Sequence, residues 1–240
     1  MPSLSDDHPT FAAARLAMEL VASPAVEEVW LEPSALAGYR VGGLAVHLVR
    51  AIETIRQYSE TERPLPGDAL VDAVSYYAAV LGNHDPIASD FHDSIRARSE
   101  RRVDSGHRAL VAAATDALTW LDSNDLDPHR PVKVLDGVAV RLGDYLDTRL
   151  VELVIHSDDL AASVGIEPPA FADAAWQVVA GVLSELAQQR YSPRLLALSL
   201  ARAERFGPAT AFGLVPQLDH ESHDAGGILR LLPSSGHGPP

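Results

Sequence analysis

The stretch from Gly143 to Gly165, GDYLDTRLVELVIHSDDLAASVG, constrains the fold of this chain more than any other. It contains no proline, it begins with an acidic first turn, and Gly165 followed by two prolines supplies a stop signal. Its apolar residues recur at intervals of three and four, which is the period of one helix face. The sequence therefore predicts a helix over 143–164, with an apolar face made of Leu142, Leu146, Leu150, Leu153, Val154, Leu160 and Val164.

Four polar residues form one row along this predicted helix. Arg149, Glu152, His156 and Asp159 are separated by three, four and three positions, so neighbouring Cβ atoms lie about 5–6 Å apart. The row borders the apolar face, where an unpaired charge is costly and a metal ion is one partner that would satisfy it. Glu152 and His156 project from the same side and can bind one divalent cation. Taken alone, a surface pair or a core histidine is the commoner explanation of such a pattern.

A second helix is predicted over Val41 to Ser59, VGGLAVHLVRAIETIRQYS. His47 lies in or beside its apolar face, next to Leu48 and three residues after Leu44. On this helix alone, a core histidine with one hydrogen bond is the simpler interpretation. Two helices that each place ligand-type residues beside an apolar face nevertheless make a shared metal site a specific hypothesis. The apolar face consists of Leu44, Leu48, Ala51, Ile52 and Ile55.

Composition narrows the classes of partner and compartment. The 240 residues include 33 Asp and Glu against 19 Lys and Arg, which gives a formal net charge of −14. This balance argues against a nucleic-acid binder and against an anionic membrane surface as partner. The chain has no cysteine, so disulfides, cysteine-ligated zinc and a cysteine nucleophile are excluded. The polar, acidic start is unlike a signal peptide and no apolar run reaches a membrane span, so a cytoplasmic protein is expected.

The remaining stretches complete the expected organisation. Residues 130–141 alternate valines around Leu135-Asp136-Gly137, which predicts a short β-hairpin with Val132 opposite Val140 and Val134 opposite Val138. Residues 1–165 are expected to form a four-helix bundle that includes this hairpin. Residues 166–240 are expected to add further helices and a small appendage, 207–240, whose end is disordered. Other helices are predicted over 11–23, 69–81, 89–121, 171–190 and 193–206, and the bundle helices are 11–23, 41–59, 89–121 and 143–164.

Two stretches together, VGGLAVHLVRAIETI and YLDTRLVELVIHSDDLAASVG, resemble the mycothiol-dependent maleylpyruvate isomerase family, a branch of the DinB-like metal-binding four-helix bundles. The resemblance implies an all-α DinB-like bundle with a short β-hairpin before its fourth helix and a small C-terminal appendage. It also implies that His47, Glu152 and His156 bind one divalent metal. Three nitrogen and oxygen ligands suit zinc, with nickel or another first-row ion as alternatives, and leave one position open.

The same resemblance extends to Arg149 and Asp159, which match family positions and are assigned here as candidate catalytic residues. Asp159 could orient a ligand imidazole through its free N–H, or form an ordinary ion pair. Arg149 could pair with Glu152 three residues on, hold Asp159, or bind a substrate carboxylate. The sequence leaves these alternatives open.

The chemistry implied by the resemblance uses an external thiol. The open metal position would bind the sulfur of mycothiol and keep it as a nucleophilic thiolate. In the isomerase, the thiolate adds to a cis double bond, rotation follows, and elimination gives the trans product. The expected function is therefore isomerase or S-transferase chemistry on a small electrophile. Full-length relatives carry a C-terminal α/β domain that residues after 190 do not resemble, so a non-catalytic metal- or ligand-binding bundle is the alternative.

Overall fold

The computed structural model describes residues 8–60, 63–81 and 90–201, and these fall into two compact units that divide between Ser192 and Pro193. The first unit contains every helix and strand up to α8, and the described part of the second is the helix α9 (Pro193–Ala201). The predicted tail 207–240 lies outside the described residues. None of the described helices is long and apolar enough to cross a bilayer.

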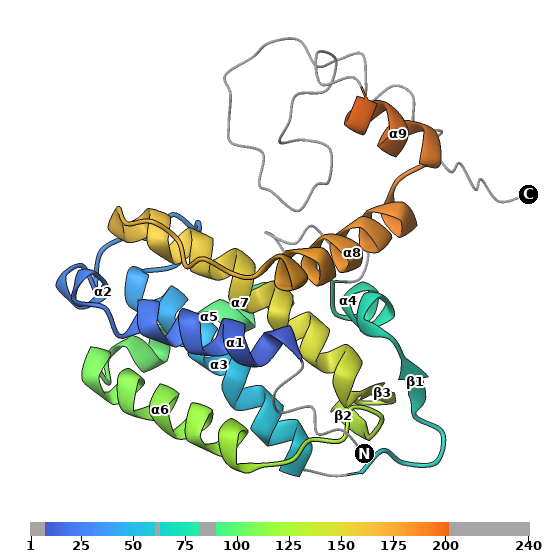
Figure 1. The fold of residues 1–240 in the computed structure, drawn as a ribbon, viewed down its shortest axis with the longest axis horizontal. Coiled ribbons are helices and arrows are strands. Elements are labelled where there is room, and N and C mark those ends of the chain that lie inside the picture. The colour runs from blue at the N-terminus through green and yellow to red at the C-terminus, as the bar shows by residue number, and fades with distance from the viewer. Residues whose placement is uncertain (1–7, 61–62, 82–89, 202–240) are drawn as a thin grey trace, which may run out of the picture. The chain divides into compact units, whose positions relative to one another are not determined.

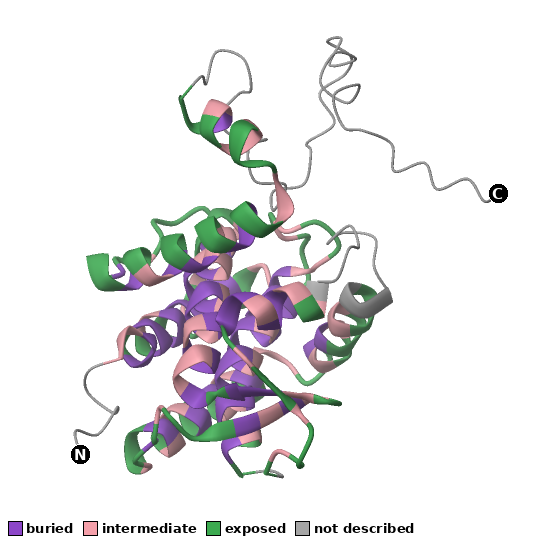
Figure 2. Ribbon diagram, turned by 90° about the vertical axis from the view of Figure 1, so that its right-hand side faces the viewer, coloured by how far each residue is buried: buried purple, intermediate pink, exposed green. Residues whose placement is uncertain are grey.

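The predicted bundle is confirmed in the first unit. It consists of α1 (Pro9–Val21), α3 (Val41–Glu60), α6 (His107–Ser123) and α7 (Leu142–Val164), with α7 packed along both α1 and α3 (Figure 1). Buried residues follow the inner faces of these helices (Figure 2), as the apolar periodicity requires. α7 ends where predicted, at Gly165 with φ of 69°. The predicted apolar face of α3, made of Leu44, Leu48, Ala51, Ile52 and Ile55, is buried throughout.

The region predicted as one helix over 89–121 is two helices. α5 (Asp90–Val103) and α6 are separated by a turn in which Gly106 has φ of 83°, a conformation that favours glycine. The Trp30 indole donates a hydrogen bond to the Val103 carbonyl at 3.0 Å and so satisfies the end of α5. The single-helix prediction was wrong because the periodicity continues through a break that a distant tryptophan stabilises. A short helix that was not predicted, α2 (Pro24–Glu28), begins at a proline, which is favourable in a first turn.

The hairpin is present, and it belongs to a three-stranded sheet. β2 (Pro131–Leu135) pairs antiparallel with β3 (Val138–Arg141), and Gly137 has φ of 75°. Val132 faces Val140 as predicted, but Leu135 faces Val138, because an irregularity between Lys133 and Leu135 displaces Val134 from the predicted pair. β1 (Ala69–Val71) adds to β3 in parallel and replaces the first residues of the helix predicted over 69–81.

Two helices complete the surroundings of α7. α4 (Ala73–Leu81) begins after Asp72, whose carboxylate accepts a hydrogen bond from the Ser75 backbone N–H at 2.7 Å. α8 (Asp173–Arg190) packs on α7 and on α4. The hairpin, α4 and α8 therefore border the helix that carries the predicted polar row.

Candidate metal centre

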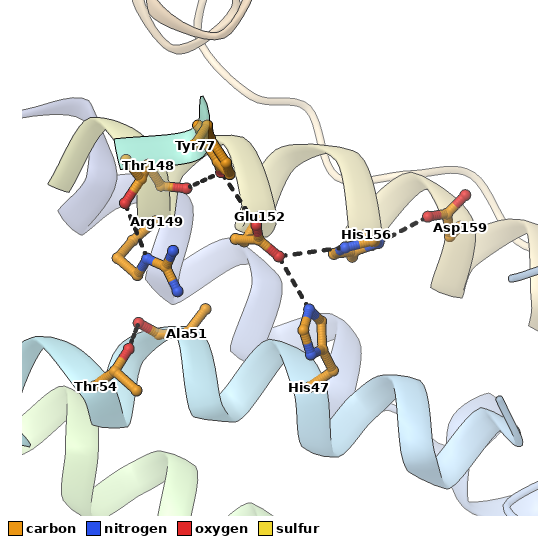
Figure 3. Close-up of polar contacts among 9 residues, drawn as sticks. All are labelled: His47, Ala51, Thr54, Tyr77, Thr148, Arg149, Glu152, His156 and Asp159. Carbon is orange, nitrogen blue, oxygen red and sulfur yellow. Dashed lines mark hydrogen bonds and ion pairs between the residues drawn. The ribbon is translucent and has the colours of Figure 1, made fainter. Parts of the chain in front are cut away.

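The three predicted ligands meet at one point between two helices. His47 extends from α3, and Glu152 and His156 extend from successive turns of α7 (Figure 3). His47 Nε2 lies 3.0 Å from Glu152 Oε2, and His156 Nε2 lies 3.3 Å from the same oxygen. One donor atom from each residue lies within 4.8 Å of the other two. The structure thus brings together residues that are more than a hundred positions apart.

Packing of the two apolar faces positions these side chains. Leu44 and Leu48 flank His47 on α3, and Leu153 adjoins Glu152 on α7; all three leucines are fully buried. His47, Glu152 and His156 sit at the border of this core, with 17%, 19% and 21% of their side chains exposed. The centre is therefore shielded from bulk solvent on the core side and still reachable from outside.

Two neighbouring groups fix the orientation of the α7 residues. Asp159 Oδ2 accepts a hydrogen bond from His156 Nδ1 at 2.9 Å, so Nε2 is the nitrogen that faces the centre. The Tyr77 hydroxyl, on α4, donates toward Glu152 Oε1 at 3.1 Å and toward the Thr148 carbonyl at 2.9 Å. Asp159 therefore contacts a candidate ligand imidazole, and the same contact is an ion pair when His156 is protonated. Such contacts set the tautomer and direction of a metal-binding side chain.

The charges of the centre depend on one another. Burial opposes the charge on Glu152, but hydrogen bonds from His156 and His47 hold its pKa well below the usual value. Burial also disfavours a charged His156, yet its bonds to Asp159 and Glu152 raise its pKa to about 9. For His47, burial dominates and lowers the pKa. Without a metal, the triad therefore carries an anionic glutamate, a cationic His156 and a neutral His47.

Arg149 lies one turn before Glu152 and points between α7 and α3 (Figure 3). Its Nε donates to Thr148 Oγ1 at 3.2 Å, and its guanidinium carbon is 4.7 Å from the centre of the Tyr145 ring. Burial opposes its charge, but the surrounding tyrosines, led by Tyr145, and Glu152 raise its pKa. Among the described residues no carboxylate forms an ion pair with Arg149, so the pairs considered with Glu152 and Asp159 are not formed.

The packing of an aromatic ring, Tyr39, beside His47 was not predicted. The Tyr39 ring lies 5.9 Å from the His47 ring, which in turn packs edge-on at 4.9 Å from His156. Burial, partly opposed by Arg96, raises the pKa of Tyr39 to about 12, so the phenol stays neutral. Nothing in the sequence of residues 31–40 signals a contact with the helix that begins at Val41.

Tyr77 was also missed. It belongs to a short apolar helix, and no spacing relates it to Glu152, 75 positions later. The only sequence signal is a tyrosine pair, Tyr76-Tyr77, in an otherwise aliphatic segment. Burial, reinforced by the charge of Glu152, raises the pKa of Tyr77 well above its usual value, so its hydroxyl remains a donor.

The donor set fits a divalent ion. Two imidazole nitrogens and one carboxylate oxygen converge, and His156 already donates its other N–H to a carboxylate, an arrangement found repeatedly around zinc. His47 Nδ1 is buried without a hydrogen-bond partner among the described residues. Nε2 of His47 is therefore the nitrogen that the fold directs at Glu152 and at an ion placed beside it.

Comparison with known proteins gives one match. The family model described as mycothiol maleylpyruvate isomerase N-terminal domain matches residues 10–161. That span runs from the first turn of α1 to the last turn of α7, and it includes the whole triad and Asp159. No curated protein and no solved structure gives a significant match to the chain.

Proposed function

Because the chain belongs to the mycothiol maleylpyruvate isomerase N-terminal domain family, we propose that it is a metal-dependent enzyme that activates mycothiol, or a similar small thiol, for isomerase or S-transferase chemistry on a small electrophile. The observation that supports this most is the convergence of His47, Glu152 and His156 from two helices. A zinc ion bound there would lower the pKa of a coordinated thiol and so supply a nucleophile that this cysteine-free chain lacks.

Each protein residue would have a separate role at the metal. Glu152 supplies the negative charge that attracts a cation, and the two imidazoles supply neutral nitrogen donors. Asp159 holds the His156 ring by its Nδ1–H, at 2.9 Å. Three protein donors leave room for an external ligand, which distinguishes a reactive site from a closed structural one.

Arg149 is proposed to bind an anionic group of the substrate. Its guanidinium is held by Thr148 and Tyr145 and has no carboxylate partner among the described residues. A guanidinium that stays charged beside the triad, with no carboxylate in direct ion-pair contact in the described part of the chain, would attract a substrate carboxylate and orient the electrophile. This role makes a small acid the favoured substrate class.

One experiment addresses both proposals. Protein purified without a metal-affinity tag is analysed for metal and assayed for thiol-dependent conversion of electrophiles and cis-dienoic acids. We expect about one zinc per chain in the wild type, loss of metal and activity in His156→Ala, and retained metal with raised KM for acidic substrates in Arg149→Ala. His156→Ala should also lose stability, because Glu152 is left without its cation.

The alternative, a non-catalytic metal- or ligand-binding bundle, is separated by the same data. Metal-replete wild type without measurable affinity for mycothiol or any other small thiol would discard the enzyme and keep the binding protein. A wild type that takes up no divalent metal would discard the metal-dependent enzyme and the metal-binding bundle, and would leave only a bundle that binds a ligand without metal.

A further inference from the structure

The carboxylate of Glu152 has two oxygens in different surroundings. Oε2 faces both imidazoles, at 3.0 Å from His47 and 3.3 Å from His156. Oε1 points away from them toward α4, where the Tyr77 hydroxyl lies at 3.1 Å (Figure 3). Tyr77 is buried, with 8% of its surface exposed, so no bulk water competes for this hydrogen bond.

The hydroxyl has two acceptors and only one proton. The second acceptor is the Thr148 carbonyl at 2.9 Å. Thr148 lies within α7, where the pattern of the α-helix already assigns the N–H of residue 152 to this carbonyl. In the part of the chain that the structure describes, Oε1 has no such backbone donor, and it belongs to an anion, which makes the stronger hydrogen bond. The Tyr77 proton therefore makes its stronger hydrogen bond with Glu152 Oε1.

We propose that Tyr77 is a positioning residue that directs Glu152 to bind the metal through Oε2 alone. The inference rests on the proposed metal site. Chelation by both oxygens would turn Oε1 away from Tyr77 and leave a buried hydroxyl without its anionic partner. With one oxygen committed, the ion keeps a coordination position for an external ligand. The Tyr77 phenol thus controls how many coordination positions of the ion remain open. It acts from α4, which carries none of the three candidate ligands.

The test is Tyr77→Phe, which removes the hydroxyl and keeps the buried ring. Zinc affinity is measured by competition with a chromogenic chelator, and the Co(II) form is examined by visible absorption, which reports coordination geometry. The matched control is Tyr76→Phe, because Tyr76 is equally buried on the same helix and, in the described part of the chain, makes no hydrogen bond to the triad.

We expect zinc affinity of Tyr77→Phe to fall about 10–100-fold, with weaker Co(II) bands that indicate a higher coordination number, whereas Tyr76→Phe matches the wild type in both. Affinity within twofold of the wild type, or an equal loss in both variants, would overturn the role of Tyr77 while leaving the metal site in place. A wild type that binds neither ion would remove the proposed function and this role with it.

Discussion

Glu152 is the residue that contacts both histidines of the candidate centre. Its Oε2 accepts from His47 and faces His156, and the protons on these rings occupy the space that a cation would take. His156 also donates from Nδ1 to Asp159, so in the metal-free protein both of its nitrogens carry protons, consistent with a pKa raised to about 9. Metal uptake must remove the Nε2 proton of His156 before that nitrogen can bind.

Zinc affinity should therefore depend on pH in a defined direction. At pH 7, which is below the raised pKa of about 9, the His156 imidazole is protonated. Each ion that binds there therefore displaces one proton. The zinc affinity should rise about tenfold per pH unit from the ordinary histidine pKa of about 6.5 up to the His156 pKa of about 9, and then level off. Calorimetry in buffers of different ionisation enthalpy measures the proton count. Release of no proton at pH 7 would contradict the charge state assigned to His156.

At this scale the sequence predicts the residues that cluster at the candidate centre better than the residues that support them. His47, Glu152 and His156 could be found because their types and spacing are local properties of two strongly periodic helices. The contact from Asp159 to His156 was predicted as one of two alternatives for the same reason. Tyr77 and Tyr39 could not be found, because their contacts depend on how α4 and the segment before α3 pack, and no periodicity encodes that.

Among the elements, the first turn of α3 is limited by close packing. A Cβ placed on Gly42 would come within 2.6 Å of the Trp30 ring, whose indole N–H is already fixed on the Val103 carbonyl. Glycine is therefore needed where α3, α5 and the segment that follows α2 meet, five residues before His47. On α8, by contrast, a Cβ on Gly181 meets no described atom within 4 Å.

These two glycines predict opposite effects of the same substitution. Gly42→Ala should lower the free energy of unfolding by about 1–2 kcal/mol, because overpacking against Trp30 outweighs the gain in helix propensity. Gly181→Ala should raise it by about 0.5–1 kcal/mol, since only the propensity changes. Urea denaturation of both variants measures the difference. Equal stabilisation by the two substitutions would show that Trp30 moves aside freely.

The element boundaries show where local patterns stop being informative. α1, α3 and α7 begin and end within about two residues of their predicted limits because apolar period and stop signals agree. β1 was assigned to a helix because its three residues become a strand only through pairing with β3, which follows almost 70 positions later. The 89–121 prediction failed for a related reason, since the break before α6 is stabilised by Trp30 from the region after α2.

At the scale of the whole molecule, a metal ion bound at the proposed site should stabilise the fold as well as serve the proposed chemistry. An ion that binds only the folded protein adds about 2.7 kcal/mol at a hundred times its Kd. For a domain of this size that corresponds to a Tm higher by about 5–10 °C. Thermal unfolding with zinc and with chelator measures the shift, and His47→Ala is the matched variant that should show none. A similar rise in His47→Ala would place the bound zinc elsewhere.

His47 and Glu152 are separated by 105 positions along the chain. An ion held by both would close a loop of that length, and in the chain-entropy description a permanent cross-link over about 100 residues disfavours the unfolded chain by about 4.7 kcal/mol. Glu152 and His156 come together as soon as α7 forms, whereas His47 must wait for the long loop to close, so full coordination would come late in folding. In a protein that has no cysteine, such an ion would be a long-range clasp that a chelator opens as a reductant opens a disulfide.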